Sequence, residues 1–373
     1  MLSADKRQST FEQFRMLECL SLAERGAGYV SPNPLVGAIV VKNGTIVGRG
    51  YHRRFGGPHA EIHALRQAGD RARGATLFVN LEPCCHSGKT PPCTDAIIRA
   101  GAKRVVIGIR DPNPLVNGKA ISLLRRSGIQ VKTGILAPEC RKLNESFITF
   151  ITSGRPFVAL KIAQTLDARI EDGSGRPRRI SNEQSRRIVH ALRARYDAVL
   201  VGANTIRVDD PQLTVRTIKG RDPYRVILDG NMSSPLSARV YRDNNRDRTI
   251  LFVSRNAARK KRSSVSALRG RGVDVRALEA SKGHLLKLES VLQELRRNNV
   301  ASILVEGGGH TFRSFLKERL VDKIIVFVSP KLFGKGQSVW DRVDARTIRH
   351  LILRDVSTWN IGGDVMVESY IGR

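Results

Sequence analysis

Apolar runs and helical patterns alternate throughout the first part of the chain. The run VGAIVV at 36–41 predicts a buried strand, and the Asn-Gly pair at 43–44 favours a hairpin turn into a second strand at 45–51. The segment HAEIHALRQAG at 59–69 has apolar residues at helical spacing. The same patterns predict four further elements: strands at 75–80 and 104–109, and helices at 94–101 and 121–128.

A Gly-Arg-Pro breaker at 154–156 follows the apolar run FITFITS and marks a boundary near 145–156. The chain then restarts with a strand-like run, PFVALKIA. The patterns beyond it predict strands at 198–202, 224–229, 249–254, 302–308 and 323–329, and helices at about 181–195, 284–297 and 309–318. We therefore predict two α/β domains, 1–150 and 151–373, each with helices covering a sheet.

The large net charge adds little to the prediction of two α/β domains. The chain has 373 residues and 64 Lys+Arg against 34 Asp+Glu, a net charge of +30 that invites a nucleic-acid interpretation. Residues 1–150 carry 22 Lys+Arg and 11 Asp+Glu, and residues 151–373 carry 42 and 23, so the two parts are almost equally basic. The charge therefore indicates only that an anionic ligand is favoured.

No apolar stretch approaches the length of a membrane span, and MLSADKRQST lacks a signal-peptide pattern, so we expect a cytoplasmic protein with no membrane partner. The five cysteines are Cys19, Cys84, Cys85, Cys93 and Cys140. An odd number with three clustered fits a reduced compartment and a metal or thiol site better than a disulfide framework. Cys19 and Cys140 are interpreted as structural. The second part has no GxGxxG motif, which does not support a standard dinucleotide-binding Rossmann unit.

Three residues at strand and helix junctions suit a catalytic zinc ion. His59 opens a helix, Cys84 follows a strand, and Cys93 precedes another helix. One imidazole and two thiolates leave an open position for water on Zn²⁺. Glu61 lies two residues after His59, so it can stand beside the metal and move protons, as hydrolytic deamination requires. Cys85 and His86 are competing ligands at this stage.

The motifs SPNPLVGAIVV, GRGYH, PHAEIHAL, LEPCCHSGKTPPC and DPNP resemble the deaminase half of the bifunctional deaminase/reductases of riboflavin biosynthesis. The resemblance covers nearly all of 12–150, and the spacing that ends in GKTPPC differs from the PCxxC of most cytidine-deaminase-like proteins. It implies a cytidine-deaminase-like α/β/α domain with one Zn²⁺ per chain on His59, Cys84 and Cys93 and with Glu61 as proton shuttle. It also implies a substrate pocket formed by Asn33, His52, His86, Lys89, Thr90, Asp111 and Asn113.

Two pocket residues have a chemistry that agrees with this resemblance. Lys89 and nearby backbone N–H groups offer a cationic corner for a phosphate. Asn33 offers both donors and acceptors to a pyrimidine edge. Cys85 stands where the family usually has a serine.

The motifs LKIAQTLDARI, ANTIRVDDPQLTVR, ILDG and LVEGGGHT resemble the reductase half of the same family. This implies a dihydrofolate-reductase-like α/β domain that uses NADPH, with a glycine-rich turn at a helix N-terminus near the pyrophosphate. The implied substrate residues are Lys161, Asp167, Arg193, Leu213, Arg216 and Glu306, and the implied cofactor residues are Ala163, Arg179, Thr205, Asp209, Gly308 and Gly309. Three positions depart from the family pattern: Arg179 replaces a tryptophan, Pro177 a serine, and Ala168 the glycine of LDG.

The predicted function has two steps on a small phosphorylated pyrimidine. The first is hydrolytic deamination of 2,5-diamino-6-(5-phosphoribosylamino)pyrimidin-4(3H)-one, and the second is NADPH-dependent reduction of its ribosyl group to ribityl. As a hypothesis, Lys161 polarises the opening sugar ring or donates a proton near it. One alternative is a monofunctional deaminase whose second domain is not catalytic. Another is a nucleic-acid deaminase, which the aromatic content of 5% and the evenly spread charge disfavour. A homo-oligomer remains open.

Overall fold

The computed structural model describes residues 4–86, 91–176, 178–281, 285–341, 343, 347, 349 and 351–372, with side chains from residue 8. The chain divides into two compact units, Met1–Gly154 and Arg155–Arg373. The boundary predicted at 150/151 falls inside the helix α6 (Glu145–Ser153), which belongs to the first unit. Among the described residues, no helix combines the length and the apolar character that crossing a membrane requires.

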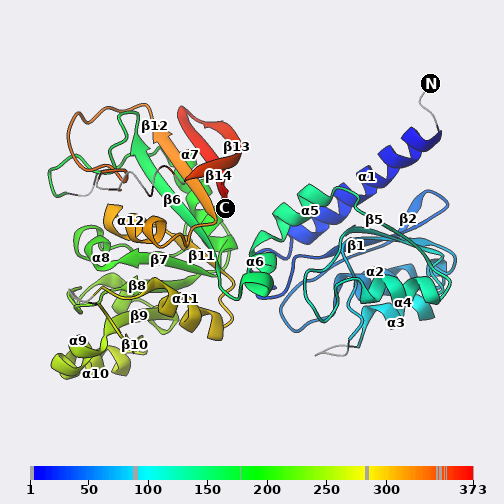
Figure 1. Cartoon of the computed structure of the whole chain (residues 1–373), viewed down its shortest axis with the longest axis horizontal. Coiled ribbons are helices and arrows are strands. Elements are labelled where there is room, and N and C mark those ends of the chain that lie inside the picture. The colour runs from blue at the N-terminus through cyan, green and yellow to red at the C-terminus, as the bar shows by residue number, and fades with distance from the viewer. Residues whose placement is uncertain are drawn as a thin grey trace. The chain divides into compact units, whose positions relative to one another are not determined.

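The first unit is a five-stranded sheet between two layers of helices. The strands are β1 (Gly37–Lys42), β2 (Thr45–Tyr51), β3 (Thr76–Leu81), β4 (Arg104–Ile109) and β5 (Gln130–Thr133). Their order is β2-β1-β3-β4-β5; β1 is antiparallel to β2 and β3, and β3, β4 and β5 are parallel. Figure 1 shows α1 (Ala4–Glu24) and α5 (Ala137–Leu143) on one face, and α2 (Ala60–Ala68), α3 (Cys93–Arg99) and α4 (Lys119–Arg126) on the other. A short 3-10 helix, η1 (Gly69–Ala72), follows α2.

The predicted turn between β1 and β2 is confirmed. Asn43 and Gly44 both have positive φ, at 50° and 77°, as a two-residue hairpin turn requires. β3 and β4 are buried along almost their whole length because helices cover both faces of the sheet.

Two glycines of β2 bring α2 unusually close to the sheet. A Cβ atom added at Gly48 would lie 2.1 Å from the carbonyl oxygen of Ala64, and one at Gly50 would lie 2.2 Å from that of Ala60. Both positions are therefore closed to any side chain unless the helix moves. The N-terminal end of α2 is fixed against β2 in this way.

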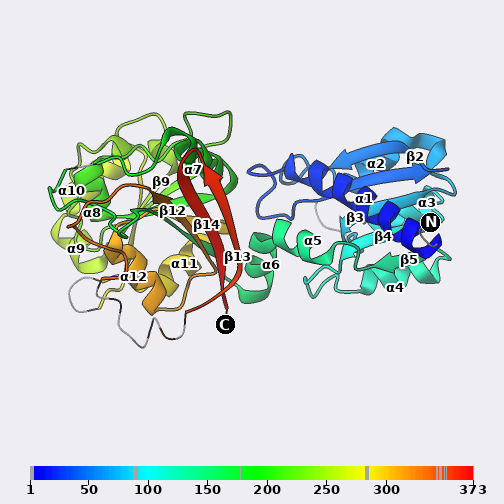
Figure 2. The same cartoon turned by 90° about the horizontal axis from the view of Figure 1, so that it is seen from above.

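The second unit is a nine-stranded sheet in the order β10-β9-β8-β7-β11-β6-β12-β14-β13. The strands are β6 (Phe157–Thr165), β7 (Ala198–Gly202), β8 (Tyr224–Leu228), β9 (Thr249–Ser254), β10 (Asp274–Leu278), β11 (Ser302–Val305), β12 (Lys323–Ser329), β13 (Ile352–Ile361) and β14 (Asp364–Gly372). The seven strands from β10 to β12 are parallel. Figures 1 and 2 show β13 and β14 as an antiparallel hairpin at one edge of the sheet.

Helices cover both faces of this sheet and form two apolar clusters. The helices are α7 (Glu183–Arg195), α8 (Ala203–Asp209), α9 (Arg255–Lys260), α10 (Arg262–Gly270), α11 (Leu288–Arg297) and α12 (Gly309–Lys317), with the 3-10 helices η2 (Arg239–Tyr241) and η3 (Arg246–Arg248). Side chains of α7 to α10 pack on one face of the sheet, and those of α11 and α12 pack on the other. The parallel strands end together at one edge, where ligands of such sheets bind.

Candidate active sites

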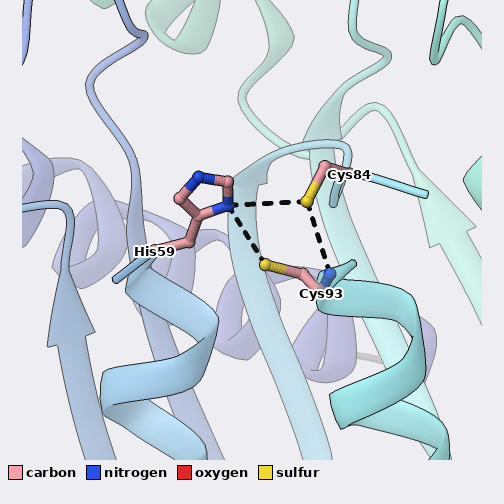
Figure 3. Close-up of side chains that lie close together, drawn as sticks. All are labelled: His59, Cys84 and Cys93. Carbon is pink, nitrogen blue, oxygen red and sulfur yellow. Dashed lines mark hydrogen bonds between the residues drawn. The ribbon is translucent and has the colours of Figure 1, made fainter. Parts of the chain in front are cut away.

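Three side chains of the first unit converge in one cluster (Figure 3). His59 caps the N-terminus of α2, Cys84 follows β3, and Cys93 is the first residue of α3. His59 Nδ1 lies 3.2 Å from Cys93 Sγ and 3.5 Å from Cys84 Sγ. The backbone N–H of Cys93 donates to Cys84 Sγ over 3.3 Å. One nitrogen and two sulfur donors thus face a common point.

The donor set fits a zinc ion. The ligand atoms of His59, Cys84 and Cys93 lie within 4.8 Å of one another, and no other His, Cys, Asp or Glu cluster of this kind occurs in the described part of the chain. Hydrogen bonds from Cys93 lower the pKa of the Cys84 thiol, although burial raises it. Thiolate and imidazole donors suit zinc, and three protein ligands leave a fourth position for a reacting group. Cys85 and His86, the competing ligands, are not members of the cluster.

Glu61 stands beside this cluster in the first turn of α2. Its side chain is buried, and its Oε2 atom has no hydrogen-bond partner. Burial raises the pKa of Glu61 to about 6. A carboxyl group with a pKa in this range can both accept and return a proton near neutral pH.

A cavity of about 280 Å³ opens onto Glu61, His59 and Cys84. Five of the predicted substrate residues line it: Asn33, His52, His86, Asp111 and Asn113. Lys89 and Thr90 lie outside the described residues. Sequence reasoning missed the other residues of the wall: Pro34, Val36, Phe55, Gly56, Gly57, Leu81, Glu82, Val116 and Phe147. Pro34, Val36, Leu81 and Glu82 lie within the motifs quoted above, and the FGG tripeptide at 55–57 stands just before the His59 motif, whereas no motif marks Val116 or Phe147.

Hydrogen bonds hold the polar wall of this cavity in place. His52 Nδ1 lies 3.1 Å from the carbonyl oxygen of Pro58, so it donates there, and Nε2 then accepts from Asn33 Nδ2 over 3.2 Å. Burial lowers the pKa of His52, which favours this neutral form. Burial also raises the pKa of another lining residue, Asp111, to about 6. The Nδ1 atom of His86 is buried without a partner.

A second polar site surrounds Glu306, which follows β11. Arg193 donates two hydrogen bonds to its carboxylate, from Nε over 2.6 Å and from Nη2 over 2.9 Å. Lys161 Nζ lies 4.0 Å from the same carboxylate. Burial raises the pKa of Glu306, but Arg193 and Lys161 outweigh it and leave the pKa lowered. Burial also lowers the pKa of Lys161, against the attraction of Glu306.

The loop 213–216 joins two more predicted substrate residues to this site. Arg193 Nη1 donates to the carbonyl oxygen of Thr214 over 3.2 Å, and Arg216 Nη1 donates to Thr214 Oγ1 over 3.0 Å. Leu213 is buried and has a positive φ of 56°. The backbone N–H of Arg216 donates to Nδ1 of the buried His190 over 3.3 Å. Sequence reasoning missed His190, because nothing marks it among the other residues of α7.

Asp167 holds a neighbouring turn. It accepts hydrogen bonds from Thr165 Oγ1 over 2.5 Å and from the backbone N–H of Gly334 over 2.8 Å. Ala168 has a φ of 60°, in the left-handed region that favours glycine. Arg179 is exposed, and its carbonyl oxygen accepts from Lys331 Nζ over 2.9 Å. Pro177 lies outside the described residues.

A second cavity, of about 620 Å³, lies at the carboxyl ends of β7 and β8. Its wall includes Gly202, Asn204, Asp229, His310 and Thr311, at the N-termini of α8 and α12 and in the loop after β8. The predicted cofactor residues Ala163, Thr205, Asp209, Gly308 and Gly309 do not line it themselves, although Gly308 caps α12 and Thr205 lies on α8. Such a position, with two helix N-termini, suits a diphosphate.

Comparisons with known proteins match a family to each of the two units. The family "RibD C-terminal domain" matches residues 156–367, and "Cytidine and deoxycytidylate deaminase zinc-binding region" matches residues 9–109. The chain is 45% identical over 350 residues to the riboflavin biosynthesis protein RibD of Aquifex aeolicus, covering 93% of this chain and 95% of that protein. It is 38% identical over 337 residues to RibD of Escherichia coli, covering 87% and 89%.

Two solved structures resemble the whole chain. The deaminase/reductase of Thermotoga maritima has a TM-score of 0.85 at 42% identity, and the similarity covers 98% of this chain and 100% of that one. RibD of Acinetobacter baumannii has a TM-score of 0.87 at 33% identity, with the same coverage. The similarity therefore extends over both units.

Proposed function

Because this chain belongs to the RibD family, it is a bifunctional deaminase and reductase of riboflavin biosynthesis, and we propose which of its residues perform each reaction. The first unit contains a zinc-binding deaminase domain, and the second contains a reductase domain related to NADPH-dependent RibD reductases. The proposed substrate is 2,5-diamino-6-(5-phosphoribosylamino)pyrimidin-4(3H)-one. Its deamination comes first, and reduction of the ribosyl group to ribityl follows.

In deamination, His59, Cys84 and Cys93 would hold a zinc ion, which would supply the Lewis acidity that makes a water nucleophilic at neutral pH. Glu61 would take one proton from that water and pass it to the ring nitrogen as the oxygen adds to the ring carbon. It would then carry the proton of the added hydroxyl to the amine, so that the C–N bond breaks and ammonia leaves. The observation that carries this assignment is the buried and unpartnered Oε2 of Glu61 beside the His59 cluster. The pKa of Glu61, raised to about 6 by burial, suits both proton transfers.

The walls of the first cavity bind the pyrimidine. Asn33, held by His52, presents its amide to the ring edge, and Asp111, Asn113 and His86 supply further polar groups of the wall. Lys89 and Thr90 bind the phosphate in this proposal. The apolar residues of the wall exclude water from the ring.

In reduction, NADPH supplies the hydride, and the second unit orients the sugar against it. Lys161, Arg193 and Arg216 place positive charge around the substrate, while Glu306 fixes Arg193 and Lys161. Lys161 protonates the opening sugar ring, and its pKa, lowered by burial, makes this transfer easier. Leu213 and Asp167 complete the substrate side; Ala163, Arg179, Thr205, Asp209, Gly308 and Gly309 form the cofactor side.

Product analysis with the phosphoribosylated diaminopyrimidine, with and without NADPH, tests this assignment. We expect ammonia release in both cases and loss of NADPH absorbance only after deamination. Ammonia release without any NADPH oxidation would instead support the monofunctional alternative. A Lys161→Ala variant that reduces the deaminated intermediate at the normal rate would contradict the role of Lys161.

The remaining expectations stay proposals. We infer a cytoplasmic location, which the five free cysteines support. Binding to nucleic acid stays disfavoured, and a homo-oligomer stays open.

A further inference from the structure

Glu82 is a buried carboxylate of the first cavity to which neither reaction gives a role. It follows β3 and lies two residues before Cys84. Its side chain is 3% exposed, and it lines the cavity together with Glu61 and Asp111. Burying a carboxylate costs free energy unless hydrogen bonds compensate the loss of water. The groups that donate to Glu82 therefore indicate what it holds in place.

The partners of Glu82 are three backbone N–H groups of a single loop and helix. Its Oε2 accepts from Asp111 over 3.2 Å and from Gly118 over 2.9 Å. Its Oε1 accepts from Ile121, in the first turn of α4, over 3.2 Å. The carboxylate therefore binds both ends of the loop 111–118 and caps the positive end of α4.

The loop that Glu82 holds carries two of the proposed substrate contacts. Asp111 Oδ1 accepts from the backbone N–H of Asn113 over 2.8 Å, and Asn113 Oδ1 accepts from that of Leu115 over 3.1 Å. These bonds fix the loop internally but do not attach it to β3. Glu82 makes that attachment, so it fixes the position of the loop relative to the end of β3, the strand that leads into Cys84.

We propose that Glu82 is a positioning residue that places Asp111 and Asn113 for substrate binding in deamination. This inference rests on the proposed role of those two residues as substrate contacts. Glu82 acts through the loop and does not touch the reacting atoms. A carboxylate is required because three converging N–H donors need an acceptor with no hydrogens, whereas the amide of glutamine would oppose donor to donor.

Steady-state kinetics of ammonia release by the full-length zinc-loaded enzyme test the proposal. In Glu82→Gln, we expect KM to rise about tenfold or more, because a small misplacement of binding groups costs about this much. We expect kcat to stay within about threefold and zinc content to stay unchanged, because the reacting groups are not displaced. A fall in kcat with unchanged KM, or loss of zinc, would overturn the positioning role.

Glu12→Gln is the matched control. Glu12 is a fully buried carboxylate of the same unit, on α1, but it pairs with Arg104 and Lys132 and does not line the cavity. If losing any buried carboxylate raises KM, this variant will show it. We expect its KM to stay at the wild-type value, and an equal rise in both variants would contradict the proposal.

Two more variants extend the test, and the first of them, Gly118→Ala, does not depend on normal folding of Glu82→Gln. Gly118 has a φ of 86°, so Gly118→Ala strains the same attachment while the carboxylate remains. We again expect KM to rise and kcat to stay nearly unchanged.

In the double variant Glu82→Gln/Asn113→Ala, the two increases in KM should not multiply, because Glu82 acts through the loop. Fully multiplied increases would overturn the proposal. An unchanged KM in Asn113→Ala alone contradicts the proposed substrate contact, whereas an unchanged KM in both Glu82→Gln and Gly118→Ala overturns only the positioning role.

Discussion

The two active sites differ in the hydrogen bonds that their central carboxyl group makes. Glu61 of the first unit is buried with one oxygen unpartnered, and the cavity beside it also contains the unpartnered Nδ1 of His86. The side chain of Glu306 in the second unit is 7% exposed; both of its oxygens accept from Arg193, and Lys161 Nζ lies 4.0 Å away. The first site leaves polar atoms for a ligand, whereas the second satisfies its carboxylate within the protein.

This difference explains how each site recognises what it binds. An unpartnered buried oxygen is costly, so the first site gains free energy when its ligands arrive. In the second site Lys161, Arg193 and Arg216 outnumber Glu306, so the network retains positive charge after its own ion pair is formed. Such a network is suited to an anionic substrate, while the pair itself keeps the arginine in place.

The largest effect that would separate the sites is loss of a zinc ligand. In Cys84→Ser or Cys93→Ser, we expect zinc to fall from about one per chain to a small fraction and ammonia release to disappear. Reduction of the deaminated intermediate should continue, because the second site uses none of these residues. Metal analysis and the two separate assays check this. Loss of both activities would contradict independent sites.

Removing the carboxyl group of Glu61 should lower ammonia release slightly less than loss of a zinc ligand does. Glu61→Gln keeps the size of the side chain and removes its ability to hold a proton, so we expect ammonia release to fall about 10²–10⁴-fold. Zinc content and reduction should remain normal. Undiminished turnover in this variant would contradict the shuttle role of Glu61.

Breaking the ion pair between Arg193 and Glu306 in the second site is the next test of the comparison. Glu306→Ala leaves Arg193 buried without its carboxylate, which we expect to cost about 3–5 kcal/mol of unfolding free energy. Urea unfolding followed together with both assays should show a less stable chain, impaired reduction and normal ammonia release under native conditions. If reduction and stability survive, the pair is not what organises the second site.

In the second site, we expect a smaller effect of His190 on how the stability of the chain changes with pH. Burial lowers the pKa of His190, with further lowering by Arg193 and Arg216 and opposition from Glu306, so the folded state holds this ring neutral. The unfolded chain binds the proton more readily, so the stabilisation is present above about pH 6.5 and is lost as pH falls through the lowered pKa. We expect the urea midpoint to fall with pH more steeply in the wild type than in His190→Asn. Parallel profiles would show that this ring does not titrate on unfolding.

The smallest expected effect concerns Ala168. Its φ of 60° lies in the left-handed region, which costs alanine about 1–2 kcal/mol more than glycine. Because glycine gives the unfolded chain extra freedom worth about 0.4–1 kcal/mol, Ala168→Gly should stabilise the chain by a net of about 1 kcal/mol or less. Thermal unfolding measures this change, and the reduction rate should rise only if strain in this turn limits the reaction. A lower unfolding midpoint would mean that the turn tolerates alanine without cost.

The sequence predicted most strands closely, because their apolar runs are short and bounded by turn residues. The ranges 104–109, 198–202, 249–254 and 323–329 agree with the structure residue for residue. It did not predict α1, in which the buried Glu12 faces inward while Phe14 and Leu17 are exposed, so the helical pattern of apolar residues is blurred. It also missed β13, whose residues are largely exposed and lack a clear alternation.

The sites were predictable to the degree that their residues are close in the sequence or lie in motifs. His59, Glu61, Cys84 and Cys93 stand in recognisable motifs at helix and strand ends, and the structure brings the three ligands together. The pairing of Arg193 with Glu306 joins residues 113 positions apart, and no local pattern encodes it. The role of Glu82 likewise depends on backbone groups, which leave no mark in side-chain identities.

For protein engineering, the contact between β2 and α2 divides neighbouring positions into closed and open ones. Gly48 and Gly50 cannot be replaced without displacing α2, which follows the proposed zinc ligand His59 and carries Glu61. Arg49 lies between them, points to the other side of the strand and is exposed. A library that varies position 49 can therefore alter surface charge or add an attachment point for a label, while positions 48 and 50 must stay fixed to preserve the catalytic geometry.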